Sequence, residues 1–332
     1  MTLHDLNPGP LLDLSGGYWQ TCALHAGVKL DVFTRIGDGA LPAGAVADAI
    51  GADRRATAML LDALAAMELL KKDGDRYSNR EMAAVFLVKT SPRYIGYIIQ
   101  HHRHLVQAWS QLDQAVITGK PVRERASFDD EEVRESFLMG MFNIAMNLAP
   151  QVAEAVDLTG RSHLLDLGGG PGTYGIHFCR KNPGLKATVF DLPTTRPFAE
   201  KTIDRFGLSD RIDFVPGDFT RDAIEGNFDA AWLSHILHGE GPDTCRKIVD
   251  KAVTALSPGG MILIHEFILD DSRDGPLFPA LFSLNMLTGT PSGQAYSEGE
   301  LRDMLEEAGA VNVRRLAFRG PTDSGIMAGD VP

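Results

Sequence analysis

Residues 164–172 read Leu-Leu-Asp-Leu-Gly-Gly-Gly-Pro-Gly, and this stretch constrains the fold more than any other part of the chain. A short apolar run contains one acid and then passes into glycines at the alternate positions 168, 170 and 172, after which residues 173–181 can start a helix. Glycine permits positive φ values and lets a ligand approach the backbone without a Cβ in the way. The pattern predicts a strand, a tight turn and a helix, which is how α/β sheets bind nucleotides at the carboxyl ends of their strands.

The spacing of these glycines indicates which nucleotide the turn can hold. It is G-x-G-x-G, whereas dinucleotide folds carry G-x-G-x-x-G. S-adenosylmethionine (SAM) has no pyrophosphate for a helix N-terminus to hold, but it has an ammonium and a carboxylate. Asp166, two residues before Gly168, is placed to reach that amino-acid end. The spacing favours SAM, and a phosphate-binding or NAD-binding loop is the alternative for this stretch taken alone.

A second acid follows the next predicted strand. Residues 186–192 read KATVFDL, a run rich in β-branched residues that ends at Asp191. The second strand of a nucleotide-binding sheet places its ribose-hydroxyl acceptor at this point. SAM and NAD both need such an acceptor, so Asp191 predicts a nucleoside ligand without choosing between them.

A third acid separates the two ligands. Residues 211–219 read RIDFVPGDF and end in Gly217, Asp218 and Phe219. Asp218 can accept a hydrogen bond from an adenine amino group while Phe219 packs on the ring, a contact for which an NAD fold has no particular use. Any one of the three acids, taken singly, is equally well explained as a helix cap or a solvated loop residue. Three acids at the ends of three successive strands favour SAM.

Composition and charge exclude several classes of function. No apolar run reaches the length of a membrane span, and the N-terminus lacks the basic start and apolar core of an export signal. Three widely spaced cysteines indicate neither a disulfide framework nor a metal cluster, and they fit a reducing cytoplasm. Residues 1–104 carry 11 basic and 11 acidic side chains, and residues 105–332 carry 21 basic and 33 acidic ones. Neither part has the basic surface of a nucleic-acid-binding protein, so we expect no nucleic-acid and no membrane partner.

The chain changes character near residue 104, so we expect two domains, 1–104 and 105–332. In the first, Asp53 can cap a helix over residues 54–70, and residues 70–78 read as a small hairpin. A helix, a turn, a helix and a hairpin form a winged-helix pattern.

The second part alternates between strand and helix patterns, with a long helical stretch over residues 130–155 that we expect to be interrupted near Pro150. Such alternation predicts a mostly parallel sheet with helices on both faces. The predicted strands are residues 163–167, 186–191, 211–215, 228–234, 261–268, 311–318 and 325–330.

Taken together, the motifs resemble those of one enzyme family. The chain is similar to the plant-type class I SAM-dependent O-methyltransferases, which include caffeate and acetylserotonin methyltransferases and bacterial relatives acting on aromatic polyketides. The resemblance implies an α/β fold with a Rossmann-like SAM-binding sheet, and before it an all-helical, winged-helix-like dimerisation domain. It also implies a homodimer and a small-molecule acceptor. The residues that carry it are LLDLGGGPG at 164–172, FDLP at 190–193, GDF at 217–219, LSHILH at 233–238, SPGGMILIHE at 257–266 and LNMLTGTPSG at 284–293.

The resemblance assigns a set of residues to the cofactor. Ser234 stands where plant members often carry a lysine, and Met141 and Ala145 match helix positions that line the cofactor and acceptor. Core packing is the alternative reading of these two helix positions. The expected cofactor-binding residues are Asp166, Gly168, Gly170, Asp191, Leu192, Gly217, Asp218, Phe219, Ser234 and Met141.

The resemblance also assigns the chemistry. A phenol has a pKa near 10, so a base assists its methylation, and histidine titrates closer to neutral pH. His238 matches the family's catalytic base, Glu266 matches the acid that orients it, and His235 is expected to be structural. Two departures stand out: His238 is followed by Gly239 where the family has Asp-Trp, and a further family acid falls on Ala295.

Other functions stay open on the sequence alone. They are C- or N-methylation of a small molecule without base catalysis, a SAM-binding winged-helix regulator that acts on DNA, and an NAD-dependent oxidoreductase. A metal site is not expected. His101, His102 and His104 lie on one predicted helix, where adjacent side chains do not converge.

Overall fold

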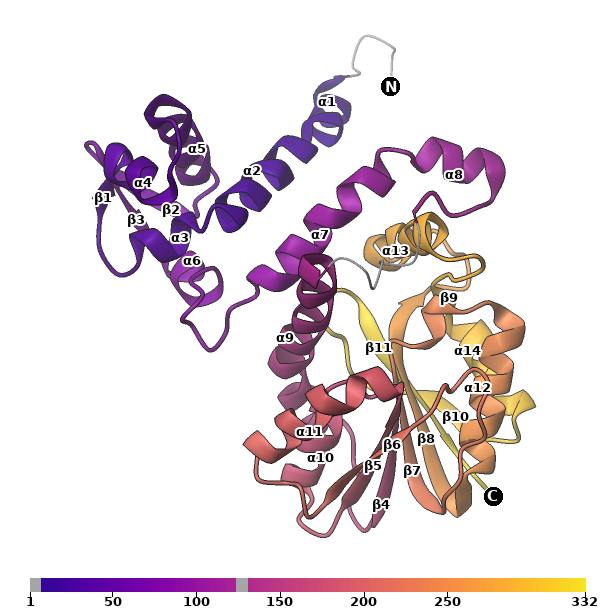
Figure 1. The fold of residues 1–332 in the computed structure, drawn as a ribbon. Coiled ribbons are helices and arrows are strands. Elements are labelled where there is room, and N and C mark those ends of the chain that lie inside the picture. Colours follow the sequence, from indigo (N-terminus) through magenta and orange to yellow (C-terminus); the bar gives the residue numbers. More distant parts are fainter. Residues whose placement is uncertain (1–6, 124–130) are drawn as a thin grey trace. The chain divides into compact units, whose positions relative to one another are not determined.

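The computed structural model describes residues 7–123 and 131–332 (Figure 1). The chain divides into two compact units. One comprises Met1–Val106 with Phe128–Ile144, and the other comprises Gln107–Ser127 with Ala145–Pro332. Helices α7 (Gly96–Trp109) and α9 (Glu131–Ala155) contribute residues to both units, and α8 (Leu112–Thr118) belongs to the second.

The first unit combines short helices with a small sheet. The expected hairpin is confirmed as β2 (Leu70–Asp73) and β3 (Arg76–Asn79), and β1 (Leu41–Pro42) pairs with β3. The expectation of an all-helical domain is therefore wrong, because this unit contains a three-stranded antiparallel sheet. Its other helices are α1 (Gly9–Gly16), α2 (Tyr18–Lys29), α3 (Val32–Ile36), α4 (Ala43–Ile50), α5 (Arg54–Ala66) and α6 (Glu81–Phe86).

Helix α5 shows how the sequence builds this unit. Asp53 caps it, because its Oδ1 accepts a hydrogen bond from the Ala56 N–H over 2.8 Å. Leu61 and Leu64, at helical spacing, are completely buried among apolar side chains of the neighbouring elements. The cap and the apolar stripe together place the start of α5 where the sequence predicts it, but the helix ends at Ala66, before the predicted residue 70.

Helix α9 runs through Pro150, so the expected interruption there is wrong. Ala149, Val152 and Val156 continue the buried stripe across the proline. Packing of that stripe offsets the roughly 3 kcal/mol that an internal proline costs a helix. The first residue of the predicted stretch, Asp130, lies outside the described residues.

The second unit is built on a seven-stranded sheet in the order β6-β5-β4-β7-β8-β11-β10. Strands β4 to β8 pair in parallel, and β11 and β10 pair antiparallel at one edge. The short β9 (Tyr296–Ser297) pairs with β8 away from this path. The strands are β4 (His163–Leu167), β5 (Lys186–Asp191), β6 (Ile212–Pro216), β7 (Phe228–Ser234), β8 (Leu256–Leu269), β10 (Val311–Arg315) and β11 (Ser324–Asp330).

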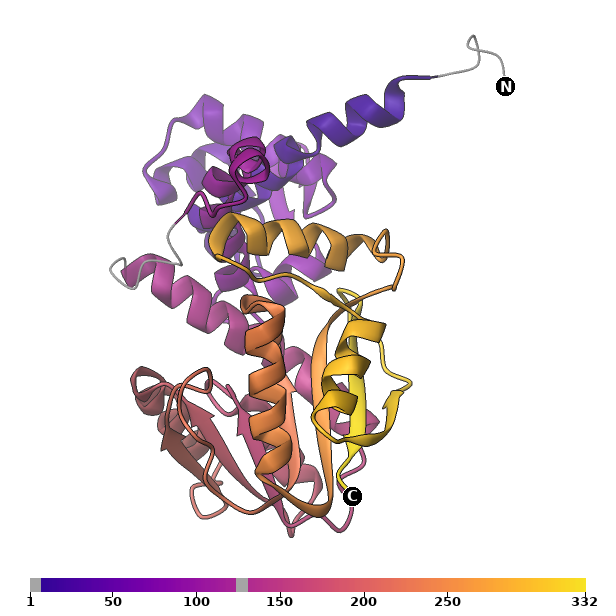
Figure 2. The same cartoon turned by 90° about the vertical axis from the view of Figure 1, so that its right-hand side faces the viewer.

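Helices cover both faces of this sheet, as the alternating pattern predicts. The C-terminal half of α9, with α10 (Thr173–Lys181) and α11 (Arg196–Arg205), packs on one face around the buried Trp232 (Figure 1). Helices α12 (Pro242–Thr254) and α14 (Glu298–Glu307) pack on the other face, and Figure 2 shows both of them lying against the strands. Helix α13 (Leu277–Gly289) follows β8.

This topology gathers the carboxyl ends of β4, β5 and β6 at one edge of the sheet. β5 lies between the other two, with Leu167 paired to Phe190 and Asp191 paired to Pro216. The three strands whose ends carry the sequence-predicted acids are therefore direct neighbours.

The helices within 7–123 and 131–332 are each too short or too polar to cross a lipid bilayer.

Candidate functional site

The glycine-rich turn after β4 has the backbone that its sequence predicts. Gly168, Gly170 and Gly172 have φ values of 66°, 55° and 76°, which side-chain-bearing residues rarely adopt. The Gly168 N–H donates to the Phe190 carbonyl over 2.8 Å and holds the turn against β5. A Cβ on Gly168 would lie 2.6 Å from Cγ2 of Ile236, so no other residue fits at this position.

Asp166 lies beneath this turn with an exposed fraction of 1%. Its Oδ2 accepts a hydrogen bond from the Gly175 N–H over 3.1 Å, whereas its Oδ1 is buried without a hydrogen-bond partner among the described residues. Burial raises the pKa of Asp166 to about 7, and the nearby Asp191 adds to the rise. A buried carboxyl oxygen with no donor is a ready acceptor for a ligand N–H or a bridging water.

Asp191 is the last residue of β5, and its side chain accepts a hydrogen bond from the glycine-rich turn after β4. Its Oδ2 accepts from the Gly170 N–H over 2.8 Å, and its Oδ1 accepts from the Leu192 N–H over 2.6 Å and from the Thr195 hydroxyl over 3.0 Å. Burial raises the pKa of this carboxyl. Two carboxylate oxygens offer about four lone-pair sites, so Asp191 retains acceptor capacity for a hydroxyl. Leu192 is partly exposed beside it.

Gly217, Asp218 and Phe219 follow β6, next to Asp191. The Gly217 N–H donates to the Asp191 carbonyl over 2.9 Å, and a Cβ on Gly217 would collide with the Phe190 ring. Oδ1 of Asp218 accepts from the N–H and the hydroxyl of Thr220, and the hydroxyl bond is the main cause of its lowered pKa. The ring of Phe219 borders Gly168, since its Cε1 lies 3.2 Å from where a Cβ there would be.

Ser234 and Met141, which are also expected to bind the cofactor, lie on elements other than the glycine-rich turn and the β5 and β6 ends. Ser234 ends β7, and its hydroxyl lies 3.0 Å from Nδ1 of the fully buried His265. Met141, on α9, belongs to the other compact unit, and Ala145 begins the second unit's share of that helix. The structure therefore brings together the sequence-predicted residues of the turn and of the β5 and β6 ends, all of which belong to the second unit.

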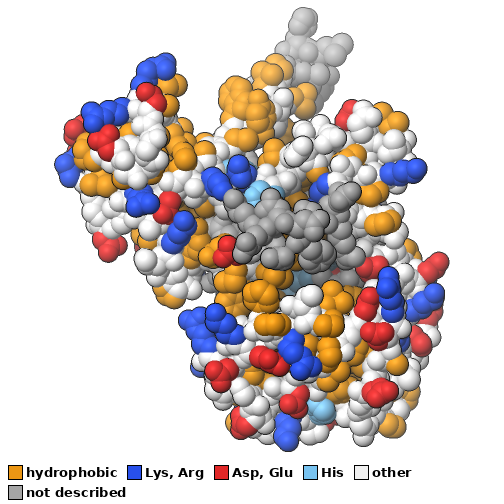
Figure 3. All heavy atoms as spheres, in the orientation of Figure 1, with side chains coloured by type: hydrophobic (Ala, Val, Ile, Leu, Met, Phe, Trp, Pro, Cys, Tyr) orange, Lys and Arg blue, Asp and Glu red, His pale blue; other side chains and the backbone are white. Residues whose placement is uncertain are grey.

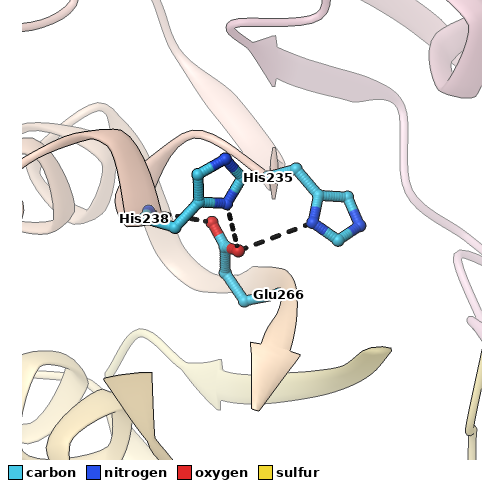
Figure 4. Close-up of side chains that lie close together, drawn as sticks. All are labelled: His235, His238 and Glu266. Carbon is cyan, nitrogen blue, oxygen red and sulfur yellow. Dashed lines mark hydrogen bonds and ion pairs between the residues drawn. The ribbon is translucent and has the colours of Figure 1, made fainter. Parts of the chain in front are cut away.

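A histidine–glutamate pair lies after the next strands of the sheet (Figure 4). His238 is in the short 3-10 helix η3 (Leu237–Gly239) after β7, and Glu266 is in the neighbouring β8. Nδ1 of His238 lies 2.8 Å from Oε2 of Glu266, while Oε1 accepts from the Leu237 and His238 N–H groups at 2.9 and 3.3 Å. The carboxylate therefore fixes both the backbone and the ring of His238.

The charge on Glu266 determines the tautomer of His238. Glu266 has an exposed fraction of 1%, and burial by itself would raise its pKa. The imidazoles of His238 and His235 outweigh burial and hold the pKa of Glu266 below its usual range. An ionised carboxylate can only accept hydrogen bonds, so in the neutral form of His238 the proton is on Nδ1 and the lone pair is on Nε2. A lone pair at Nε2 is what a general base requires.

His235 contacts the same carboxylate, which its sequence position does not reveal. Its Nδ1 lies 3.5 Å from Oε2 of Glu266 (Figure 4). Its ring centroid lies 4.4 Å from that of His265. His235 adopts a φ of 56°, a left-handed value unusual for a residue with a side chain. This turn, which directs the imidazole back toward Glu266, has no signal in the order of residue types.

His235, His238 and Glu266 also form the one group with metal-compatible spacing among the described His, Cys, Asp and Glu residues, since their ligand atoms all lie within 4.8 Å of one another. In this structure Nδ1 of His238 is engaged by the carboxylate itself. That direct hydrogen bond suits proton transfer at Nε2, whereas coordination of a metal through Nδ1 would require this atom to give up its proton and its hydrogen bond to Glu266.

Aromatic side chains enclose His238 on one side. The centroid of its ring lies 4.8 Å from that of Phe282 on α13, and the Phe267 ring lies 4.6 Å from Phe282 and 4.9 Å from Phe278. Ala295, where the resemblance implies a further acid, is buried. Phenyl rings lower the polarity around the base and offer flat surfaces to a planar ligand.

Comparison with known proteins identifies the family. Residues 109–310 match the O-methyltransferase domain and residues 12–89 match the O-methyltransferase dimerisation domain. The chain is 36% identical to the 3-hydroxy-5-methyl-1-naphthoate 3-O-methyltransferase of Streptomyces sahachiroi, with 97% of this chain and 95% of the relative covered. It is 33% identical to the tetracenomycin polyketide synthesis 8-O-methyl transferase TcmO of Streptomyces glaucescens, with 96% of each covered.

A solved structure gives the same result. The crystal structure of human N-acetylserotonin methyltransferase in complex with SAM matches with a TM-score of 0.88 and 27% identity, covering 100% of this chain and 99% of the human one. Both family domains and full-length relatives thus agree with the fold described above. The chain belongs to the O-methyltransferase family.

Proposed function

We propose that this enzyme transfers the methyl group of SAM to a hydroxyl of a small aromatic or polyketide-like acceptor, with His238 as the general base and Glu266 as the residue that orients it. The observation that carries the proposal is the 2.8 Å hydrogen bond between His238 Nδ1 and the buried Glu266 carboxylate, which leaves Nε2 as the basic atom.

The residues at the ends of β4, β5 and β6 fit SAM. The unpartnered Oδ1 of Asp166 would accept from the amino-acid end, directly or through water. Asp191, beside Leu192, would accept from the ribose hydroxyls, and Asp218 with Phe219 would hold the adenine, next to Gly217. Gly168 and Gly170 would let the ligand approach the backbone, and Ser234 would border the site. Met141 is included among the proposed cofactor residues on the family resemblance alone.

SAM supplies an electrophilic methyl group on a sulfonium that leaves as neutral S-adenosylhomocysteine (SAH). The protein therefore has three tasks, which are to align the acceptor oxygen, to exclude water and to remove the hydroxyl proton. Nε2 of His238 takes that proton, and the ring becomes an imidazolium. Glu266, in contact through Nδ1, stabilises the positive charge in a site from which water is largely excluded.

The acceptor class rests on two supports. One relative named above is a 3-O-methyltransferase of 3-hydroxy-5-methyl-1-naphthoate, and the other is an 8-O-methyl transferase of tetracenomycin polyketide synthesis. Phe267, Phe278 and Phe282 line the side of His238 with rings suited to an aromatic acceptor.

We also propose that the domain boundary falls at residues 104 and 105, and that residues 1–104 form a winged-helix-like domain that joins two copies of the chain. Figure 3 shows apolar side chains gathered over α1 and α2, where Leu14 is 80% and Trp19 is 68% exposed. So large an exposed apolar area suits burial against a second copy. Arg54, on α5, is paired with Asp48 over 2.8 Å, which does not suit nucleic-acid binding. The free Cys22, Cys179 and Cys245 are consistent with a cytoplasmic enzyme.

A substrate screen tests the proposal. The purified protein is incubated with SAM and a panel of naphthols, hydroxynaphthoates and anthraquinone phenols, and SAH is quantified by mass spectrometry. We expect SAH formation with a stoichiometric methyl ether, identified by the carbon-13 shift of its O-methyl group. A C-methyl or N-methyl product would replace the proposed reaction by the alternative without base catalysis. SAM binding without SAH formation, together with specific DNA binding, would favour a regulator.

A further inference from the structure

Arg123 is a half-buried cation for which the described residues 7–123 and 131–332 offer no hydrogen-bonding or ionic partner at Nε. Its Nε is buried without a hydrogen-bond acceptor, and no ion pair to its guanidinium is found in the part of the chain that the structure describes. Burial lowers the pKa of this guanidinium below its usual value, and no neighbouring charge contributes to the shift. A buried cation without an anion is costly, so its retention indicates a use beyond folding.

The position of Arg123 is fixed from both sides. The backbone N–H groups of Val122 and Arg123 donate to the Thr288 carbonyl over 3.1 and 3.2 Å, which ties this segment to the end of α13. A Cβ on Gly289 would lie 2.5 Å from Nη2 and 2.6 Å from Nε of Arg123. The guanidinium therefore lies directly over the bare backbone of Gly289 and could not occupy this place over a larger residue.

Helix α13 connects this cation to His238. Phe282, whose ring contacts the His238 ring, precedes Gly289 by seven residues, which is close to two helical turns. The two residues therefore lie on one face of α13, about 10 Å apart along its axis. The loop after the helix returns to His238, because a Cβ on Gly293 would lie 2.5 Å from the His238 carbonyl oxygen.

We propose that Arg123 binds a carboxylate on the methyl acceptor, so that the preferred acceptors are aromatic hydroxy acids. Their hydroxyl lies at His238, their ring system lies along the Phe282 face of α13, and their carboxylate lies at Arg123. The planar guanidinium can hold such a carboxylate with two parallel hydrogen bonds. This inference rests on the proposed function, because it takes His238 as the point at which the hydroxyl is held.

A structural role for Arg123 is the competing explanation. It lies at the C-terminus of α13, where a positive charge interacts favourably with the helix dipole. A lysine would preserve that interaction, but it would not preserve the paired hydrogen bonds to a carboxylate. Variants at this position therefore separate the two roles.

The test measures binding without turnover. The hydroxynaphthoates that carry the hydroxyl at position 6 and the carboxylate at position 1 or 2, on opposite rings, and the matching 2-naphthol are titrated calorimetrically into the protein saturated with SAH. We expect at least one acid to bind wild-type protein about 10- to 100-fold more tightly than the naphthol, as charge-assisted hydrogen bonds allow. Arg123→Met should reduce this ratio to about 1–3, and Arg123→Lys should give an intermediate ratio. The matched control Lys120→Met, which removes a nearby exposed cation, should keep the wild-type ratio.

Two results would overturn the inference. One is wild-type protein that binds no acid more tightly than the naphthol. The other is an Arg123→Met protein that loses affinity equally for both ligands and melts at a lower temperature, which would assign Arg123 to the helix end. Turnover distinguishes this inference from the proposed function. Methyl ether formation without acid preference refutes only the role of Arg123, whereas Arg123-dependent binding without any methyl transfer refutes only the proposed function.

Discussion

Nδ1 of His238 and Oε2 of Glu266 are 2.8 Å apart, although His238 lies in the 3-10 helix after β7 and Glu266 lies within the neighbouring β8. The carboxylate is buried and ionised, and its other oxygen is occupied by the backbone N–H groups of η3. Glu266 thus holds the backbone, the ring and the tautomer of His238 at once. The proposed catalysis depends on this single contact.

Replacing Glu266 by Gln should separate orientation from cofactor binding. The amide retains the shape but loses the charge that stabilises the imidazolium, so we expect kcat to fall by ~10²–10⁴-fold. The SAH dissociation constant, measured by calorimetry, should change by less than about threefold because Glu266 is not among the proposed cofactor residues. Glu225→Gln, at an exposed position, is the matched control. Equal loss of turnover and of SAH affinity would assign Glu266 to the cofactor site.

Asp166 should make the ligand-free enzyme less stable as the pH rises. Its pKa is about 7 in the fold against an ordinary value of 3.8, so the folded protein binds more protons than the unfolded chain between these values. Stability contributed by this group is therefore lost as the pH rises from about 4 to 7. Asp166→Asn removes this titration, and its melting temperature should exceed that of the wild type by a few degrees at pH 8 and by less at pH 4.5.

The same variant should bind SAM more weakly, because the amide lacks a charge for the ammonium group. At pH 8, titration calorimetry measures the SAM dissociation constant, and scanning calorimetry of the same preparation measures the melting temperature. Parallel melting curves for the two proteins across this pH range would contradict the assigned pKa, and unchanged SAM affinity would remove Asp166 from the site.

Gly168 should tolerate no side chain. Alanine there would place Cβ 2.6 Å from Ile236 Cγ2 at a φ of 66°, so the turn must shift at a cost of ~1–2 kcal/mol from the backbone alone. We expect Gly168→Ala to weaken SAH binding at least tenfold. Gly184→Ala is the matched control, because nothing lies within 4 Å of its Cβ position and its φ is ordinary. Equal SAH affinity of the two variants would show that the turn does not form the cofactor site.

The exposed apolar side chains of α1 and α2 should hold the dimer together. Charges at Leu14 and Trp19 would be buried without partners in an interface, so Leu14→Glu with Trp19→Glu should give a monomer by light scattering at micromolar concentration. The pair Asp13→Lys and Gln20→Lys, at exposed neighbouring positions, tests for a nonspecific effect of charge. A wild-type monomer, or a dimer that survives the glutamates, would place any interface elsewhere.

Much of the fold could be predicted because β4, β5 and β6 are short strands that end at, or directly before, an acid or a glycine. Strand β8 is longer than predicted. It begins at Leu256 and includes Ser257-Pro258-Gly259-Gly260, which by composition signals only the end of a helix. Gly259, with a φ of 78°, lets the strand bend, and the pairing with β7 shifts register there. A local sequence signal cannot reveal a partner strand that absorbs such a bend.

The parts of the candidate site whose roles follow from local sequence could be predicted. The parts whose roles depend on contacts with distant chain segments could not be predicted. The glycines and Asp191 follow from local spacing. The approach of His235 to Glu266 depends on an unusual backbone angle, and the setting of Arg123 depends on Gly289, which is far away in the sequence. These contacts are tertiary, so they cannot be predicted from periodicity or motif spacing.

The most direct test of His238 as the base is the pH dependence of single-turnover methyl transfer to 2-naphthol, measured with saturating SAM for the wild type and His238→Ala. The account predicts a rate at pH 7.5 that is ~10²–10⁴-fold lower in the variant. It also predicts that the variant's rate rises with pH toward the pKa of the phenol near 10, as the hydroxyl ionises without help. Added imidazole should restore part of the rate. A variant that keeps the wild-type rate and pH profile would contradict the account.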